Sequence, residues 1–194
     1  GRPYMQRSVN TLNIRQRFLI VCEGEKTEPN YFKCFRGPFI VVDAMGIGAN
    51  TKSLVEQAIE LKAKDDYDQI WCVFDKDDNS VSQFNEAIKL ARRNHIKIAY
   101  SNQSFELWYV LHFCLMRSAI TRSDYKKHLN KKLGHTYKKN CETIYSELHE
   151  LQKDAIRNAK LLLTEYTPRR PAVDDPSTTV HELVEQLNKY SNNC

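Results

Sequence analysis

The chain has 194 residues, 41% hydrophobic and 27% charged, with a formal net charge of +5. This composition is typical of a single soluble globular domain that buries its core without disulfide staples. It contains no apolar run near the roughly 18 residues of a membrane span, so we expect neither a transmembrane helix nor a signal peptide. The six cysteines are scattered and form no CxxC pair, which favours free thiols and a cytoplasmic location.

Four short apolar runs predict β-strands near residues 17–22, 38–42, 69–74 and 96–100. The first three are almost continuous in large or β-branched residues, as expected for strands buried on both faces. Segments with helical spacing accompany them and predict helices at 28–35, 54–61, 84–91 and 104–116. The alternation of strands and helices predicts an α/β fold with three layers around a mainly parallel, four-stranded sheet.

Beyond residue 117 the pattern becomes helical and polar. It predicts helices at 123–132, 141–164 and 178–190, the last of them capped by Ser177 or Thr178. We therefore divide the chain into three parts. A basic N-terminal segment spans 1–16, an α/β core spans 17–116, and a helical extension packed on the core spans 117–194.

Acidic side chains follow the first and third predicted strands. The first strand runs into Glu23 and Glu25, and the third runs into Asp75, Asp77 and Asp78. The carboxyl ends of parallel strands are where ligand sites collect. Clustered acids repel one another unless a cation neutralises them, and their oxygens suit Mg²⁺ or Mn²⁺. Asp75 and Asp77 point to the same side of an extended segment, so both can reach one ion.

The competing interpretation is that these acids only cap the helices that follow them, and Glu28, near the start of the predicted helix at 28–35, fits it well. For any one acid taken alone, capping is the better explanation. The combination of Glu23 with the Asp75 and Asp77 pair at one sheet edge favours a metal site instead. Asp78 leaves open which two of the three aspartates bind the metal.

A Glu-Gly after the first strand and a DxD after the third resemble the Toprim domain of topoisomerases, bacterial primases and overcoming-lysogenization-defect nucleases. Four segments, FLIVCEGEKTEPNYF, VFDKDDN, SNQSFELWYVLHF and DPSTTVHELVEQL, together resemble the RloB family of small Toprim proteins. The resemblance spans residues 17–190. It implies a Toprim-like fold, a link to restriction and abortive-infection loci, a role in phage defence, and often an AAA-type ATPase partner.

The same resemblance implies roles for single residues. Glu23 takes part in general acid–base chemistry, and Asp75 and Asp77 hold the metal. Glu25 is a further catalytic candidate that could supply a carboxylate for a second ion, and Lys26 is placed to meet a phosphate. Glu25 and Lys26 could equally be solvated loop residues.

A basic stretch from Arg117 to Lys139 contains eight Lys or Arg residues and one acid, Asp124. Clustered cations of this kind bind polyanions by displacing their counterions. We expect nucleic-acid contacts from Lys126, Lys127, Lys131 and Lys132, with Tyr125 and Tyr137 stacking on unpaired bases. The alternative is a flexible, solvated arm that keeps the protein soluble.

Glu106 and His181 are candidates for additional site contacts. Glu106 falls in the first turn of the predicted helix at 104–116, where Ser104 would be the cap and the helix dipole favours an acid. His181 falls in the first turns of the last helix, where a phosphate contact competes with simple capping. For Glu106 the structural and functional interpretations stay open, and for His181 capping is preferred.

The expected function is a Mg²⁺- or Mn²⁺-dependent endonuclease that acts on RNA or DNA as an RloB-like effector in anti-phage defence or abortive infection. A second hypothesis is a non-catalytic nucleotide- or nucleic-acid-binding regulatory subunit of an AAA-type ATPase. A third is a housekeeping Toprim phosphotransferase or RNA-processing enzyme. The expected partners are nucleic acid and an AAA-type ATPase, with a homo-oligomer possible and no membrane involved.

Overall fold

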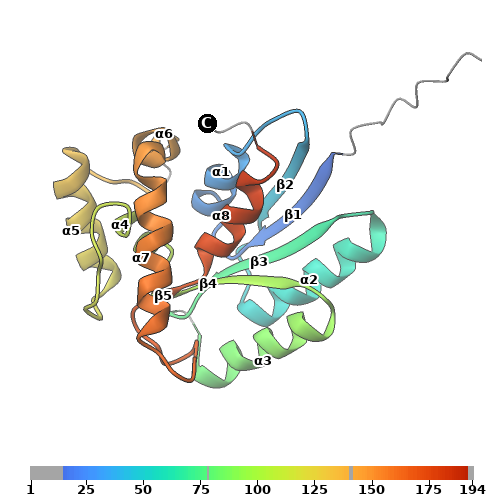
Figure 1. Ribbon diagram of the computed structural model, residues 1–194. Coiled ribbons are helices and arrows are strands. Elements are labelled where there is room, and N and C mark those ends of the chain that lie inside the picture. Colours follow the sequence, from blue (N-terminus) through green and yellow to red (C-terminus); the bar gives the residue numbers. More distant parts are fainter. Residues whose placement is uncertain (1–14, 78, 140–141, 192–194) are drawn as a thin grey trace, which may run out of the picture.

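The computed structural model of the chain describes residues 15–77, 79–139 and 142–191. Most of the basic segment predicted at 1–16 lies outside the described residues. Five strands form one sheet: β1 (Gln16–Cys22), β2 (Ile40–Gly46), β3 (Gln69–Asp75), β4 (Lys97–Asn102) and β5 (Ser177–Thr178). Their order is β2-β1-β3-β4-β5, with the first four parallel and β5 antiparallel to β4 (Figure 1).

The fifth strand corrects the predicted count of four. Neither Ser177 nor Thr178 occupies the N-cap position of the last helix; they pair with Asn102 and Ser101 at the end of β4. The Thr178 hydroxyl still accepts a hydrogen bond from the backbone N–H of Val180 at 3.2 Å. The helix begins after Thr179. A Ser-Thr-Thr run after a proline is compatible with a helix cap and with a short strand. Here it forms a strand because β4, which is distant in the sequence, pairs with it. The part of the chain after residue 117 thus contributes a strand to the sheet.

The helices in chain order are α1 (Thr27–Lys33), α2 (Thr51–Lys64), α3 (Val81–Arg93), α4 (Glu106–Val110), α5 (Arg122–Leu133), α6 (Ile144–Leu148), the 3₁₀ helix η1 (His149–Leu151), α7 (Gln152–Thr164) and α8 (Val180–Asn188). Two predicted helices were too long. The one expected at 104–116 ends as an α-helix at Val110, because His112 and Phe113 bond to carbonyls three residues back. The one expected at 141–164 is divided by η1.

Each face of the sheet carries its own core, because successive strand residues point to opposite faces. On β1, Phe18 and Ile20 join a cluster that extends through α1, α4, α5, α7 and α8. Leu19 and Val21 join a second cluster under α2 and α3. Figure 1 shows α1 and α8 over one face of the sheet and α2 and α3 over the other, which confirms the three predicted layers. Among the described residues, no helix is long and apolar enough to span a membrane.

The loop after β1 lies directly against the end of β2, and Gly46 permits this approach. A Cβ atom built on Gly46 would stand 2.2 Å from the carbonyl oxygen of Gly24 and 2.4 Å from the Cα of Glu25. Both are backbone atoms, so a side chain at residue 46 would have to move the loop itself. The absence of a side chain at Gly46 therefore positions the acidic loop that begins at Glu23.

We expect Gly46→Ala to lower the free energy of unfolding by about 2 kcal/mol, since overpacking against backbone forces a shift of the chain. Gly134→Ala is the control. It meets nothing within 4 Å, and its φ of +75° costs only about 1 kcal/mol for an L-residue. Urea unfolding followed by circular dichroism measures both. Equal losses in the two variants would contradict the close approach at Gly46.

Candidate active site

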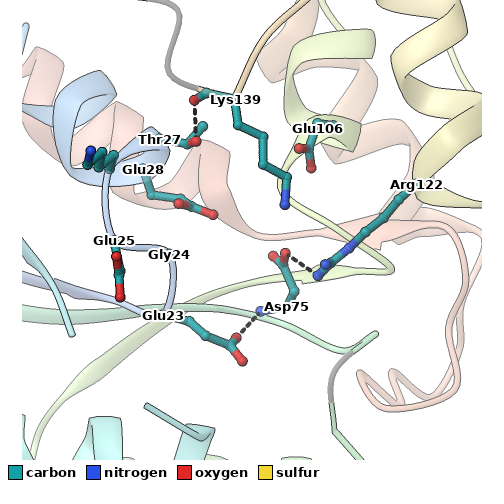
Figure 2. A pocket seen from close by; sticks show the side chains of 10 residues that line it. Glu23, Gly24, Glu25, Thr27, Glu28, Asp75, Glu106, Arg122 and Lys139 are labelled. Carbon is teal, nitrogen blue, oxygen red and sulfur yellow. Dashed lines mark hydrogen bonds and ion pairs between the residues drawn. The ribbon is translucent and has the colours of Figure 1, made fainter. Parts of the chain in front are cut away.

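A cavity of about 370 Å³ opens at the carboxyl ends of β1 and β3. Five acidic side chains line it: Glu23, Glu25, Glu28, Asp75 and Glu106. Three cationic side chains line it as well: Lys26, Arg122 and Lys139. They come from the β1–α1 loop, the end of β3, the starts of α1, α4 and α5, and the turn that follows α5 (Figure 2). The cavity therefore combines excess negative charge with two cations from the basic stretch.

Glu23 and Asp75 meet at this sheet edge, as the sequence predicts. β1 and β3 are neighbours in the sheet, and the backbone N–H of Glu23 donates to Val73 O at 3.0 Å. The Glu23 carboxylate in turn accepts a hydrogen bond from the backbone N–H of Asp75 at 3.0 Å. This bond fixes the orientation of the Glu23 side chain toward the end of β3.

Asp75 and Asp77 both turn a carboxylate oxygen toward Arg122, the first residue of α5. Arg122 Nη2 lies 3.2 Å from Asp75 Oδ2, and Arg122 Nε lies 3.0 Å from Asp77 Oδ2. The two acids thus reach one cationic group, as their spacing predicts for one ion. Burial, and then the negative charges of Glu28 and Glu106, raise the pKa of Asp75, and the nearby Arg122 opposes this shift.

Glu28 is a site residue that sequence reasoning treated only as a helix cap. Its side chain is buried, and among the described residues its Oε2 atom has no hydrogen-bond partner. A Cβ atom at Gly24 would stand 2.0 Å from that oxygen, so the glycine leaves room for the carboxylate. Burial raises the pKa of Glu28 to about 7, and the charges of Glu106 and Glu23 add to the shift.

The raised pKa predicts a pH-dependent stability effect of Glu28→Gln. The folded pKa of about 7 lies above the ordinary value of 4.5. The contribution of Glu28 to the parent's stability is therefore fully present below pH 4.5 and is lost as the pH rises through 7, whereas glutamine carries no charge to bury. In EDTA, we expect the variant's gain over the parent to be about 3 kcal/mol larger at pH 8 than at pH 4. Urea titrations at both pH values measure it, and a gain independent of pH would contradict the buried charge.

Glu106 and Lys139 complete the inner wall of the cavity. Glu106 is buried, and Figure 2 shows its carboxylate, the Glu28 carboxylate and the Lys139 ammonium directed into the same space. The backbone carbonyl of Lys139 accepts a hydrogen bond from the hydroxyl of Thr27, which attaches this residue to the rim. α4, which begins at Glu106, has no side-chain cap, so the cap predicted at Ser104 is not formed. This position favours the site-contact interpretation of Glu106.

Of the remaining candidates, Glu25 and Lys26 line the cavity and His181 does not. Asp78 is not among the described residues. Glu25 lies against the loop after β2, where a Cβ at Gly48 would meet its Oε1 at 2.7 Å. His181 is buried on α8 and does not belong to the cavity lining; burial lowers its pKa to about 4. Lys26 lines the cavity from an exposed position at its mouth.

The basic stretch forms α5 and the turn after it. Lys127, Lys131 and Lys132 are exposed and Lys126 is half-buried, all outside the cavity lining. The predicted stacking role of Tyr125 and Tyr137 is wrong, because both rings are buried, with exposures of 0% and 5%. Tyr125 points inward with Leu129, one turn along the same helix face. Nucleic-acid contacts on α5 would therefore come from its lysines.

The residues of the cavity suit a hard divalent cation in their chemistry. Among the described residues, no three His, Cys, Asp or Glu side chains stand close enough together to hold a metal ion as they lie. The Arg122 guanidinium nevertheless acts as a stand-in cation for Asp75 and Asp77. Carboxylate oxygens with no sulfur or imidazole donor in the lining are the donor set for Mg²⁺ or Mn²⁺. Asp75 and Asp77 are the residues that would hold it, with Glu23 beside Asp75; Asp77 contacts Arg122 but does not itself line the cavity.

A protein-family model described as RloB-like protein matches residues 18–187. The match confirms the resemblance drawn from the four sequence segments and covers the whole sheet except its first two residues. No curated protein and no solved structure matches the sequence.

Proposed function

The chain belongs to the RloB-like protein family, and from this premise we propose that it is a Toprim-type, divalent-metal-dependent nuclease. It cleaves phosphodiester bonds of RNA or DNA as an effector in anti-phage defence, with an AAA-type ATPase as its partner. One observation carries the proposal: Glu23 and Asp75 are hydrogen-bonded to each other at the carboxyl edge of the sheet, inside an acidic cavity that Arg122 and Lys139 also line.

Each residue has a task that follows from its position. Asp75 and Asp77 bind Mg²⁺ or Mn²⁺, which when bound polarises the scissile phosphate and stabilises charge on the leaving oxygen. Glu23, oriented by the N–H of Asp75, takes the proton of the attacking water. Lys139 and Arg122, which line the same cavity, contact the non-bridging phosphate oxygens. The exposed lysines of α5 extend this positive surface away from the cavity.

A second candidate is a non-catalytic nucleotide- or nucleic-acid-binding subunit that regulates an ATPase. The observation in its favour is that Asp75 and Asp77 are already paired with Arg122 and that the carboxylates of the described residues do not converge on one point. In that case the cavity would bind a phosphate through its cations, and the carboxylates would only hold those cations in position.

A cleavage assay separates the two candidates. The full chain is incubated with single- and double-stranded RNA and DNA, in Mg²⁺, Mn²⁺ or EDTA. We expect cleavage that needs the metal and falls at least about 100-fold in Glu23→Gln. Glu60→Gln, an exposed change on α2, is the matched control and should retain activity. Nucleic-acid binding without cleavage under every condition would favour the regulatory subunit.

A further inference from the structure

We propose that Arg122 and the divalent cation compete for the same two carboxylates, Asp75 and Asp77, so that metal binding releases the guanidinium to the substrate phosphate. The inference rests on the proposed function and adds to it a way in which the chain controls its own metal site. It is based on the position of the Arg122 side chain. Arg122 lies far in the sequence from the acidic residues that follow β1 and β3.

Arg122 contacts one carboxylate oxygen of each of the two aspartates that would bind the metal ion. Its Nη2 and Nε atoms each approach the Oδ2 atom of one aspartate, at 3.2 Å and 3.0 Å. A Mg²⁺–oxygen bond is about 2.0–2.1 Å long, so an ion bound to either of these oxygens would lie close to the guanidinium nitrogen that contacts it. The guanidinium remains charged at every pH at which proteins fold. A divalent cation between the two acids would therefore face a fixed like charge at contact distance.

The ion pair between Arg122 and Asp75 is partly shielded from water, so breaking it costs free energy. The side chains of Arg122 and Asp75 are 28% and 13% exposed, whereas typical surface ion pairs are open to water and contribute little. Figure 2 shows the Arg122 guanidinium directed toward Asp75. The Lys139 ammonium and the Glu106 carboxylate point into the same space. Displacing the guanidinium from Asp75 thus costs part of the cation's binding free energy.

The backbone between Thr121 and Lys139 is held at both ends. We therefore expect only the Arg122 side chain to move when the metal ion takes its place. Thr121 and Asp124 form a reciprocal capping box that fixes the first turn of α5 around Arg122. At the other end, the Lys139 carbonyl accepts the Thr27 hydroxyl at the cavity rim. A guanidinium that leaves the aspartates therefore stays beside Lys139 in the cavity. There its planar donor fork can bind two phosphate oxygens at once.

The test is calorimetric titration of the metal-free full chain with Mn²⁺ at fixed pH. We expect Arg122→Gln to bind Mn²⁺ at least about ten-fold more tightly than the parent, a difference of about 1.4 kcal/mol. Arg122→Lys, which keeps the charge but loses the fork, should fall between the two. Arg117→Gln removes an arginine of the same basic stretch that pairs with Glu165, and it should match the parent.

A second readout separates competition from a merely structural ion pair. At saturating Mn²⁺, Arg122→Gln should cleave about ten-fold or more slowly despite its tighter metal binding, since the phosphate loses its guanidinium partner. Metal affinity equal to or weaker than the parent's in a folded Arg122→Gln would overturn the inference and leave the proposed function standing. Absence of Mn²⁺ binding in the parent and in all variants would overturn the proposed function, and the inference with it.

Discussion

Asp75→Asn should lower the affinity for Mn²⁺ at least about 100-fold and abolish metal-dependent cleavage, while the protein stays folded. Replacing even an outer partner of a metal ligand commonly costs 10–100-fold in affinity, and Asp75 is assigned here as a direct ligand. The fold should survive because burial already disfavours the charged form of this side chain, so its pKa is raised. Arg122 also retains Asp77 as a partner.

The measurement is calorimetry at fixed pH together with urea unfolding. Asp77→Asn should show the same loss of activity, and Asp66→Asn is the matched control, an exposed aspartate just before β3 at the opposite end of that strand. If Asp75→Asn and Asp77→Asn both bind Mn²⁺ as tightly as the parent, the assignment of the ligands is wrong. A variant that loses its fold would instead show that Asp75 serves mainly as the partner of Arg122.

Reversing four charges on α5 should weaken nucleic-acid binding about 100-fold at moderate salt. The variant replaces Lys126, Lys127, Lys131 and Lys132 with Glu. Each phosphate contact that is lost removes nearly one unit from the slope of log affinity against log salt, so the slope should become shallower by about 3. We expect these lysines to contact the nucleic acid because they follow Arg122 along α5, and Arg122, the first residue of that helix, lines the cavity.

The matched control reverses the same number of charges on the other face of the sheet. Lys52, Lys64, Lys89 and Arg93 are exposed on α2 and α3, and replacing them with Glu changes the net charge equally. Filter binding at several salt concentrations measures both variants, with circular dichroism to verify their folding. If the two variants lose affinity equally, the effect comes from net charge, and α5 is not the binding surface.

The sequence predicts the parts of the site that depend on local pattern and on a general rule of parallel sheets. Buried strands read as continuous apolar runs, and their carboxyl ends share one edge, so the meeting of Glu23 with Asp75 is predictable. β5 is not predictable in this way, because Ser177 and Thr178 are a strand only through pairing with β4. Two residues carry too short a pattern to identify a strand.

The residues that sequence reasoning missed enter the site from distant segments. Arg122 reaches it because α5 packs on α4, and Lys139 reaches it from the segment after α5, where its carbonyl accepts a hydrogen bond from Thr27. No local spacing reveals either contact. Glu28 looked like an ordinary first-turn acid; its burial depends on the room left by Gly24. The error at Tyr125 was avoidable, since Tyr125 and Leu129 lie four residues apart and mark the inner face of a helix.

A crystal of the full chain soaked in Mn²⁺ tests most directly whether the carboxylates at the edge of β1 and β3 form a divalent-metal site. We predict an anomalous scattering peak bound by Asp75 and Asp77, with Glu23 beside it and the Arg122 guanidinium moved away from both aspartates. A map without a peak in the cavity, with Arg122 still bonded to Asp75 and Asp77 at saturating Mn²⁺, would contradict it.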